Sequence, residues 1–246
     1  MGEAVKSPAT SDLGRRYGGD RVSIRLVCLD MAGTTVVDDG AVEDAFVQTM
    51  VEQGVAAGSA ELAGALDVVH RTMGQSKIVV FRELFADEAR AQAANAGFER
   101  AYEAGVSRGS VAALPGAADL MGALRDAGVA VCLTTGFAPS TRQAIVESLG
   151  WGGRVDLALS PADAGRGRPF PDMVLTAMLR LEVDDVRHVA VAGDTANDLL
   201  AGWRAGAGVV AGVLTGAHDR ATLEAAPHTH ILDTIADLAP LVLGPD

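Results

Sequence analysis

Long apolar runs, clustered positive charge and cysteine are all scarce in this 246-residue sequence. No stretch of about 18 uninterrupted apolar residues occurs, so the sequence predicts no membrane-spanning helix. The net charge is −12 and no segment is rich in lysine or arginine, which argues against a nucleic acid partner because clustered cations bind a phosphate backbone. Any phosphate-bearing ligand would have to be attracted by local groups, such as a metal ion, an arginine or helix N-termini.

The two cysteines, Cys28 and Cys132, each fall in a short apolar run that is typical of a buried strand. Free buried thiols suit a reducing compartment, so we expect a cytoplasmic protein whose cysteines serve packing. Residues 1–20 are rich in Gly, Ser, Arg and Asp and lack periodicity. They are predicted to form a mobile tail.

Apolar strands alternate with helical segments along most of the chain. Strands are predicted over 24–29, 129–133, 157–159, 188–192, 208–213 and 230–232, and a helix over 117–126. Residues 42–112 differ, because they are rich in Ala, Glu and Gln with helical spacing and little strand character. The pattern predicts an α/β fold in which 21–41 and 113–246 form a parallel, helix-covered sheet that carries a helical insert. Its ligand site is expected at the carboxyl ends of the strands.

Polar side chains follow the predicted strands at that edge. Asp30 ends the first strand, Thr135 follows the second, and Arg168, Asp194 and Asp198 come after later ones. Carboxylates from different strands, Asp30 and Asp194, can hold a hard cation through oxygen, for which Mg²⁺ is the natural candidate. Asp30 could then attack phosphorus while Thr135 and Arg168 bind phosphoryl oxygens. Asp198, one helical turn beyond Asp194, would support the metal or Arg168.

Each of these residues has an ordinary structural use as a turn former or helix cap, but their order along the chain resembles the haloacid dehalogenase superfamily. Its four motifs match residues 30–34, Thr135, Arg168 and 194–198. The resemblance implies a Rossmann-like core with a helical cap domain at 42–112. It further implies metal binding by Asp30, Ala32, Asp194 and Asp198, and substrate or phosphate binding by Ala32, Gly33, Thr34, Met73, Thr135, Gly136 and Arg168.

Ala32 stands where typical phosphatases of this superfamily carry a second aspartate, which protonates the leaving alkoxide. A substrate whose leaving group is carbon has less need of that proton donor. The Asp-x-Ala-Gly-Thr-Thr form, with Arg168 rather than a lysine in the third motif, resembles the phosphonatases, which are phosphonoacetaldehyde hydrolases that cleave a carbon–phosphorus bond.

Lys77 is the second feature that resembles the phosphonatases, because Met73-Gly74-Gln75-Ser76-Lys77 is similar to their Met-Gly-x-x-Lys segment. The sequence holds 18 arginines but two lysines, and Lys6 lies in the predicted tail. A partly desolvated lysine can lose its proton and act as a nucleophile, whereas an arginine cannot. The resemblance implies that Lys77 forms an imine with an aldehyde substrate, that Asp30 takes the phosphoryl group, and that the chain forms a homodimer through its cap.

Three positions depart from the phosphonatase pattern: Val80 and Phe137 replace a histidine and a tyrosine, and Met31 replaces a tryptophan. The nearby His70 could take over the role of the missing histidine.

Two other functions stay open. One is a phosphatase or phosphomutase for a small phosphate ester, in which Lys77 would be dispensable, and the other is a non-catalytic binding protein that retains the fold.

Overall fold

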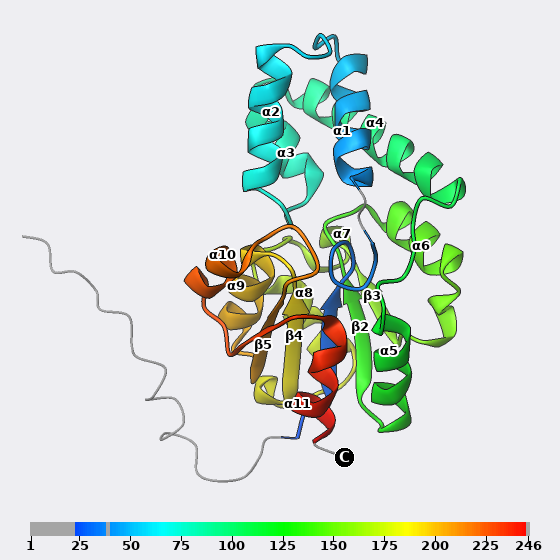
Figure 1. Cartoon of the computed structure of the whole chain (residues 1–246), viewed down its shortest axis with the longest axis vertical. Helices are drawn as coiled ribbons and strands as arrows, with labels where there is room; N and C mark the ends of the chain where they lie inside the picture. Colours follow the sequence, from blue (N-terminus) through cyan, green and yellow to red (C-terminus); the bar gives the residue numbers. More distant parts are fainter. Residues whose placement is uncertain (1–22, 38–39, 245–246) are drawn as a thin grey trace, which may run out of the picture.

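A six-stranded parallel sheet forms the centre of the computed structural model, which describes residues 23–37 and 40–244 (Figure 1). Its strands are β1 (Leu26–Asp30), β2 (Ala130–Thr134), β3 (Leu157–Leu159), β4 (Val189–Gly193), β5 (Val209–Val213) and β6 (His230–Leu232), in the spatial order β3-β2-β1-β4-β5-β6. The sheet confirms the predicted α/β fold, although four of the six strands begin or end one or two residues away from the predicted positions. The predicted tail lies outside the described residues.

Four consecutive helices lie between β1 and β2 and form what is here called the cap: α1 (Ala41–Glu52), α2 (Ala60–Arg71), α3 (Lys77–Leu84) and α4 (Glu88–Ser107). The remaining helices surround the sheet: α5 (Ala117–Asp126), α6 (Pro139–Ser148), α7 (Pro161–Ala164), α8 (Asp172–Arg180), α9 (Ala196–Ala205), α10 (Arg220–Ala225) and α11 (Ala239–Leu243), with 3₁₀ turns η1 (Trp151–Gly153), η2 (Val186–His188) and η3 (Ile235–Leu238). Within the described chain, no helix is both long and apolar enough to cross a membrane.

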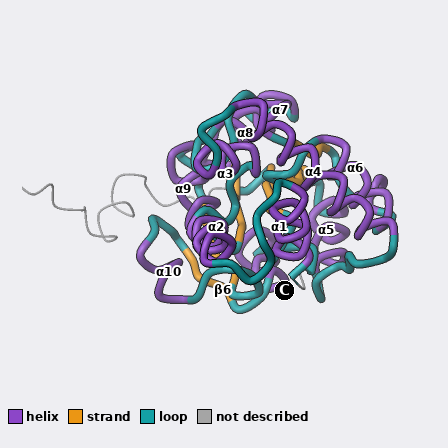
Figure 2. The backbone as a smooth tube through the Cα atoms, turned by 90° about the horizontal axis from the view of Figure 1, so that it is seen from above, coloured by secondary structure: helices purple, strands orange, loops and turns teal. Residues whose placement is uncertain are grey.

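The central strand β1 is buried along its whole length because helices cover both faces of the sheet. Successive side chains point to opposite faces, so Cys28 packs in one cluster with Met173 of α8, while Leu29 packs in another with Leu120 of α5. Figure 2, which looks down on the molecule from the cap side, shows the strands running between layers of helices. The carboxyl end of β1, where Asp30 lies, is therefore held by packing on both sides.

Stacked aromatic rings hold the cap helices together. Phe81 of α3 lies 5.5 Å from Phe46 of α1 and 6.4 Å from Phe98 of α4, measured between ring centroids, and all three side chains are fully buried. Such ring pairs stabilise a small helical unit beyond the apolar area that they bury. The helix that begins at Lys77 is thereby fixed to its neighbours.

The chain crosses between core and cap twice, and the two crossings pair with each other. Val36 and Ala113 form an antiparallel bridge. The backbone N–H of Leu114 donates to the carbonyl of Thr35 at 2.9 Å, and the N–H of Val37 donates to the carbonyl of Ala112 at 2.8 Å. The cap is thus joined to the core by a short two-stranded ribbon, here called the linker ribbon (residues 35–37 and 112–114).

Candidate active site

The polar residues at the strand ends meet in a crevice beside β1, where the strand order reverses. A cavity of about 290 Å³ opens there between the core and the cap. It is lined by Asp30, Ala32, Gly33, Thr135, Gly136, Phe137, Arg168, Asp194, Thr195, Thr215, Gly216 and Ala217 of the core, and by Gly40, Val42, Glu43, His70, Met73, Gly74, Gln75 and Lys77 of the segment between the two crossings. The cavity is large enough for a small organic ligand.

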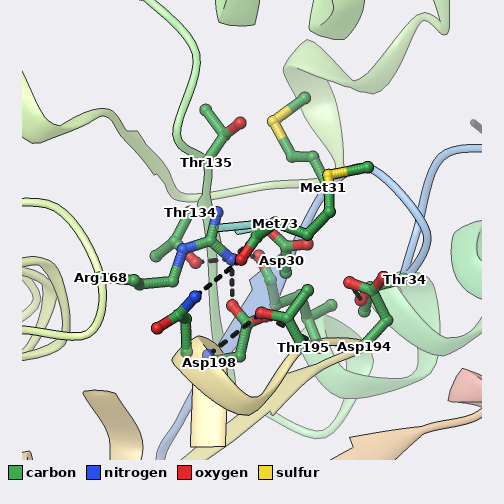
Figure 3. Close-up of polar contacts among 12 residues, drawn as sticks. Asp30, Met31, Thr34, Met73, Thr134, Thr135, Arg168, Asp194, Thr195 and Asp198 are labelled. Atoms are coloured by element: carbon green, nitrogen blue, oxygen red, sulfur yellow. Dashed lines mark hydrogen bonds and ion pairs between the residues drawn. The ribbon is translucent and has the colours of Figure 1, made fainter. Parts of the chain in front are cut away.

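Arg168 lies between two buried carboxylates, as Figure 3 shows. Its Nη1 is 2.6 Å from Oδ1 of Asp30 and also pairs with Oδ1 of Asp198. All three side chains are at most 5% exposed, so the ion pairs are shielded from water and strong. The other oxygen of Asp198 accepts hydrogen bonds from the backbone and the hydroxyl of Thr195. Asp198 therefore fixes Arg168 in front of Asp30.

Asp194 follows β4 and is held from two loops. Its Oδ2 accepts a hydrogen bond from the backbone N–H of Ala217 at 2.6 Å, and its Oδ1 accepts one from the hydroxyl of Thr34 at 3.3 Å. Burial raises the pKa of Asp194 to about 6, and the negative charge of Asp198 acts in the same direction. Gly33 has φ +78°, and a Cβ atom there would lie 2.4 Å from Oδ2 of Asp194, so only glycine allows this close approach.

Three buried carboxylates, those of Asp30, Asp194 and Asp198, offer oxygen atoms within 4.8 Å of one another. Burial raises the pKa of Asp30 well above its usual range, while the charge of Arg168 opposes that shift. A dense set of buried carboxylate oxygens is the donor set that a hard divalent cation requires, and such a cation would offset the remaining negative charge. The residues present therefore fit a metal ion.

The loop after β2 brings Thr135 to the cavity and meets the cap. The hydroxyl of Thr135 accepts a hydrogen bond from the backbone N–H of Phe137 at 3.2 Å, which orients the threonine. A Cβ atom on Gly136 would lie 2.8 Å from the carbonyl oxygen of Gln75, so the cap backbone rests directly on this loop. Thr135 is 2% exposed as a result.

Lys77 is the first residue of α3, and its side chain lines the cavity from the cap side. Its side chain is buried, with Nζ 5.8 Å from the centre of the Phe98 ring. Met73 precedes it in the segment 73–76, here called the cap loop, and its carbonyl accepts a hydrogen bond from the side-chain amide of Asn197 at 2.7 Å. The cap loop is thereby tied to the core helix α9 next to the acidic cluster.

Most of the predicted site residues line this one cavity, namely Asp30, Ala32, Gly33, Met73, Lys77, Thr135, Gly136, Arg168 and Asp194. Thr34 and Asp198 do not line it. Thr34 is fully buried and donates to Asp194, whereas Asp198 lies behind Arg168. The structure thus places these two residues where they can orient the groups that face the ligand.

Two of the three replacements in the phosphonatase pattern, Val80 and Phe137, occupy different surroundings, and the third, Met31, is fully buried and does not line the cavity. Val80 is fully buried within the cap and does not line the cavity, so its side chain packs inside the cap. Phe137 does line the cavity, and its ring centre lies 4.5 Å from that of Tyr102 in α4. An aromatic contact between cap and core therefore takes the place of a hydroxyl group.

Sequence reasoning missed Glu43 and residues 215–217 of the cavity, and it named His70 without its partner. Glu43 and His70, from α1 and α2, form a pair with 3.2 Å between Oε2 and Nε2. Their separation of 27 positions left no local signal, because only the packing of the two helices brings them together. Residues 215–217 follow β5, and the rule that ligands bind beyond the carboxyl ends of strands could have indicated them.

Known proteins resemble this chain in sequence and in fold. The chain is 30% identical to the phosphonoacetaldehyde hydrolase of Bordetella pertussis over 153 residues, which cover 52% of this chain and 55% of that protein. It is 32% identical to the probable phosphatase IndB of Dickeya dadantii over 124 residues, which cover 50% of this chain and 53% of that protein. The chain therefore spans about half the length of these curated relatives.

A solved structure from Oleispira antarctica, described as a phosphonoacetaldehyde hydrolase like protein, shares the fold with a TM-score of 0.75. The two chains are 22% identical, and the match covers 99% of this chain and 100% of the other. The family model for haloacid dehalogenase-like hydrolases matches residues 24–206, which hold all four motifs and the cap. With the sheet, the buried aspartates and this match in agreement, the chain belongs to the haloacid dehalogenase-like hydrolases.

Proposed function

We propose that this hydrolase is magnesium-dependent and cleaves the carbon–phosphorus bond of phosphonoacetaldehyde or a related small phosphonate. One observation carries the proposal: Lys77 of the cap and Asp30 of the core line the same cavity of about 290 Å³. An amine and a carboxylate that face one small ligand can act on two of its ends, a carbonyl carbon and a phosphorus atom. Arg168 and Thr135, which line the same cavity, would bind the phosphoryl oxygens.

Asp30, Asp194 and Asp198 would hold the Mg²⁺ ion, together with Ala32, which offers only its backbone oxygen. When bound, the ion would neutralise negative charge on the phosphoryl group and on the carboxylates. Arg168 would keep its contact with Asp30 and present its guanidinium group to the phosphoryl oxygens. Arg168 and the ion would together offset the charges of the three carboxylates, which would allow an anionic phosphoryl group to bind in a chain of net charge −12.

The reaction would begin at Lys77, whose neutral amine adds to the aldehyde carbon and loses water to give a protonated imine. Asp30 then attacks phosphorus, the C–P bond breaks, and its electron pair moves to carbon to form an enamine. Protonation of the enamine carbon and addition of water release acetaldehyde and free Lys77. A second water molecule hydrolyses the aspartyl phosphate on Asp30, so the net reaction consumes one water and yields acetaldehyde and phosphate.

Ala32 supports this reaction over ester hydrolysis. It lines the cavity and carries no group that could protonate an alkoxide. In the proposed reaction the protonated imine accepts the electrons of the C–P bond, so the leaving group needs no proton at that step. The cap, residues 42–112, would close over the substrate and exclude water from the imine and the aspartyl phosphate.

Borohydride trapping tests the proposal directly. The protein is incubated with phosphonoacetaldehyde and Mg²⁺, reduced, and mapped by mass spectrometry, and we expect a reduced adduct on Lys77 together with acetaldehyde release. Lys77→Arg keeps the positive charge but should lose both signals. Asp30→Asn should retain the adduct but release no phosphate. An unmodified Lys77 at saturating substrate, with no acetaldehyde, contradicts C–P cleavage.

A phosphatase or phosphomutase acting on a small phosphate ester is the second candidate, and the similarity to the probable phosphatase IndB favours it. This reaction would use Asp30, Arg168 and the metal but not Lys77. A panel of small phosphate esters distinguishes the two functions. Equal ester turnover by the wild type and by Lys77→Arg, without phosphonate turnover, would support the phosphatase.

Two predictions about the setting accompany the proposal. Cys28 and Cys132 lie opposite each other in neighbouring strands as free, buried thiols, which supports a reducing, cytoplasmic location. A homodimer through the cap is consistent with the half-exposed side chains of Val51 on α1 and Val79 on α3. Sedimentation of the wild type and of a Val79→Glu variant would test the dimer.

A further inference from the structure

Glu43 and His70 are a pair of cap residues that line the cavity and that the proposed reaction does not use. Nε2 of His70 lies 3.2 Å from Oε2 of Glu43, and this contact joins the last turn of α2 to the first turn of α1. Each residue suits its own helix end, because an acidic group is favoured at an N-terminus and a basic group at a C-terminus. The helix dipole acts on every face of a helix end, however, so it does not explain why both side chains line the cavity.

The pair lies at the open part of the cavity. Both of its side chains are about half-exposed, whereas the side chains of Asp30 and Arg168 are 5% exposed and Lys77 is also buried. A ligand that meets Asp30 with one group and Lys77 with the next would therefore direct any further substituent toward the pair. The two residues are placed to contact the part of a ligand that lies farthest from phosphorus.

His70 is also joined to the segment that leads to Lys77. Its backbone carbonyl accepts a hydrogen bond from the N–H of Met73, the first residue of the cap loop, at 3.4 Å. The side-chain amide of Asn197 in α9 in turn holds the carbonyl of Met73. When the cap is closed, His70 thus keeps a fixed relation to the cap loop and to the core.

The chemistry of the pair favours a neutral polar group as its ligand. The contact between the two side chains uses Oε2 of Glu43 and Nε2 of His70, and each side chain has a second polar atom, Oε1 and Nδ1. A hydroxyl group can donate to the glutamate, and it can donate to or accept from the histidine in either protonation state. A ligand carboxylate would be repelled by Glu43, and a ligand ammonium group by a protonated His70.

We propose that Glu43 and His70 form a specificity site that selects substrates with a hydroxyl group beyond the carbonyl carbon, on the side away from phosphorus. The inference rests on the proposed function and deepens it, because the carbonyl group is the one that meets Lys77. The substrate class is then a phosphonate whose carbonyl group belongs to a hydroxymethyl ketone. Cleavage of its C–P bond would consume one water and yield hydroxyacetone and phosphate, as the aldehyde would yield acetaldehyde and phosphate.

Binding of phosphonates that lack a carbonyl group tests the inference without the reaction. Propylphosphonate and its terminally hydroxylated form have the proposed carbon skeleton but cannot form an imine with Lys77. In titration calorimetry with Mg²⁺ present, we expect the wild type to bind the hydroxylated compound about tenfold more tightly, the gain typical of a hydrogen bond to a charged group. No preference, or tighter binding of the matched terminal amine or carboxylate, would overturn the proposal.

Variants of the pair locate this preference. Glu43→Ala and His70→Ala should each bring the affinity ratio close to one, and Glu43→Gln, which keeps an acceptor, should retain part of it. The matched control is the pair of Arg71 and Glu83, which joins α2 to α3 with similar exposure and 2.7 Å between Nη2 and Oε1 but does not line the cavity. Arg71→Ala should keep the wild-type ratio. An unchanged ratio in Glu43→Ala, or an equal loss in Arg71→Ala, would show that the pair only ties helices together.

Turnover separates this inference from the proposed function. The wild type should cleave the hydroxymethyl ketone with a higher kcat/KM than the corresponding methyl ketone. Glu43→Ala should remove the difference mainly through KM, because the pair acts on binding. Equal kcat/KM for both ketones would refute the specificity site and leave C–P cleavage in place. If no phosphonate is cleaved while the preference for the hydroxyl group persists in binding, the proposed function fails and the recognition of the hydroxyl group by the pair stands.

Discussion

The side-chain amide of Asn197, in the first turn of α9, donates a hydrogen bond of 2.7 Å to the backbone carbonyl of Met73 in the cap loop. Asn197 directly precedes Asp198, which holds Arg168 in front of Asp30. The residue that binds the cap loop and the residue that holds Arg168 therefore lie in the same turn of α9. Any change that lifts the cap loop should be detected in catalysis before it affects the fold of the core.

Gly74 offers the sharpest test of this contact. It has φ +82°, and a Cβ atom would lie 2.4 Å from the hydroxyl oxygen of Thr195. We expect Gly74→Ala to lower kcat/KM at least tenfold, because the cap loop can no longer reach its closed position. Gly54→Ala is the matched control, since Gly54 has φ +89° with open space around its Cβ position. It should cost about 1 kcal/mol of stability from backbone strain and leave kcat/KM unchanged. Equal kinetic losses in both variants would contradict the closure argument.

Ala32 predicts a gain of function. Placing a carboxyl group at the cavity in Ala32→Asp supplies the missing proton donor, and hydrolysis of small phosphate esters should rise by about a hundredfold. Cleavage of the phosphonate should not rise, because its leaving group is carbon. Ala32→Asn has nearly the same shape but transfers no proton, so it separates acid catalysis from polarity. The comparison is made by measuring phosphate release from both substrate classes, and a similar gain in Ala32→Asn would argue against acid catalysis.

The acidic cluster predicts an order of metal-binding losses. Asp194 lines the cavity, whereas both oxygens of Asp198 are engaged by Arg168 and Thr195. We expect Asp194→Asn to abolish Mg²⁺ binding in titration calorimetry, and Asp198→Asn to weaken it by about 10- to 100-fold. Chelation of the metal should stop phosphate release by the wild type, and added Mg²⁺ should restore it. Stronger binding by Asp194→Asn than by Asp198→Asn would reverse this assignment.

The salt bridge that joins α3 to α4 predicts a pH effect on the cap. Hydrogen bonds from Arg82 lower the pKa of the exposed Glu88 to about 2 from an ordinary value of 4.5. A carboxylate with a lowered pKa stabilises the folded state above pH 4.5, and this contribution is lost as the pH falls toward 2. Glu88→Gln should therefore unfold at a slightly lower temperature than the wild type at pH 6, and the difference should vanish near pH 2. High salt should also reduce it, since the pair is exposed. A difference that persists in acid would show that the charge of Glu88 is not its cause.

The elements of the core could be read from the sequence because each buried strand is a short apolar run, and Asp30 and Asp194 could be placed because they directly follow such runs. The burial of Val80 could not be predicted from the sequence. It lies three residues after Lys77, on the same helix side, yet the packing of α3 buries it entirely while Lys77 reaches the cavity. The hydrogen bond from the hydroxyl of Thr141 in α6 to Glu99 of α4 also had no local signal, because it depends on how the cap rests on the core.

The linker ribbon has a mechanical consequence for the reaction. Two chain segments that are hydrogen-bonded side by side bend across their flat face more easily than they stretch or shear, since shear would break the bonds between Thr35, Val37 and their partners. We expect this pairing to limit movement of the cap to rotation about one axis and so to return Lys77 to the same position relative to Asp30. Inserting a single residue in one segment would shift the pairing by one position and turn its side chains to the opposite face. We expect such an insertion to separate the two proposed covalent steps although it changes neither Lys77 nor Asp30.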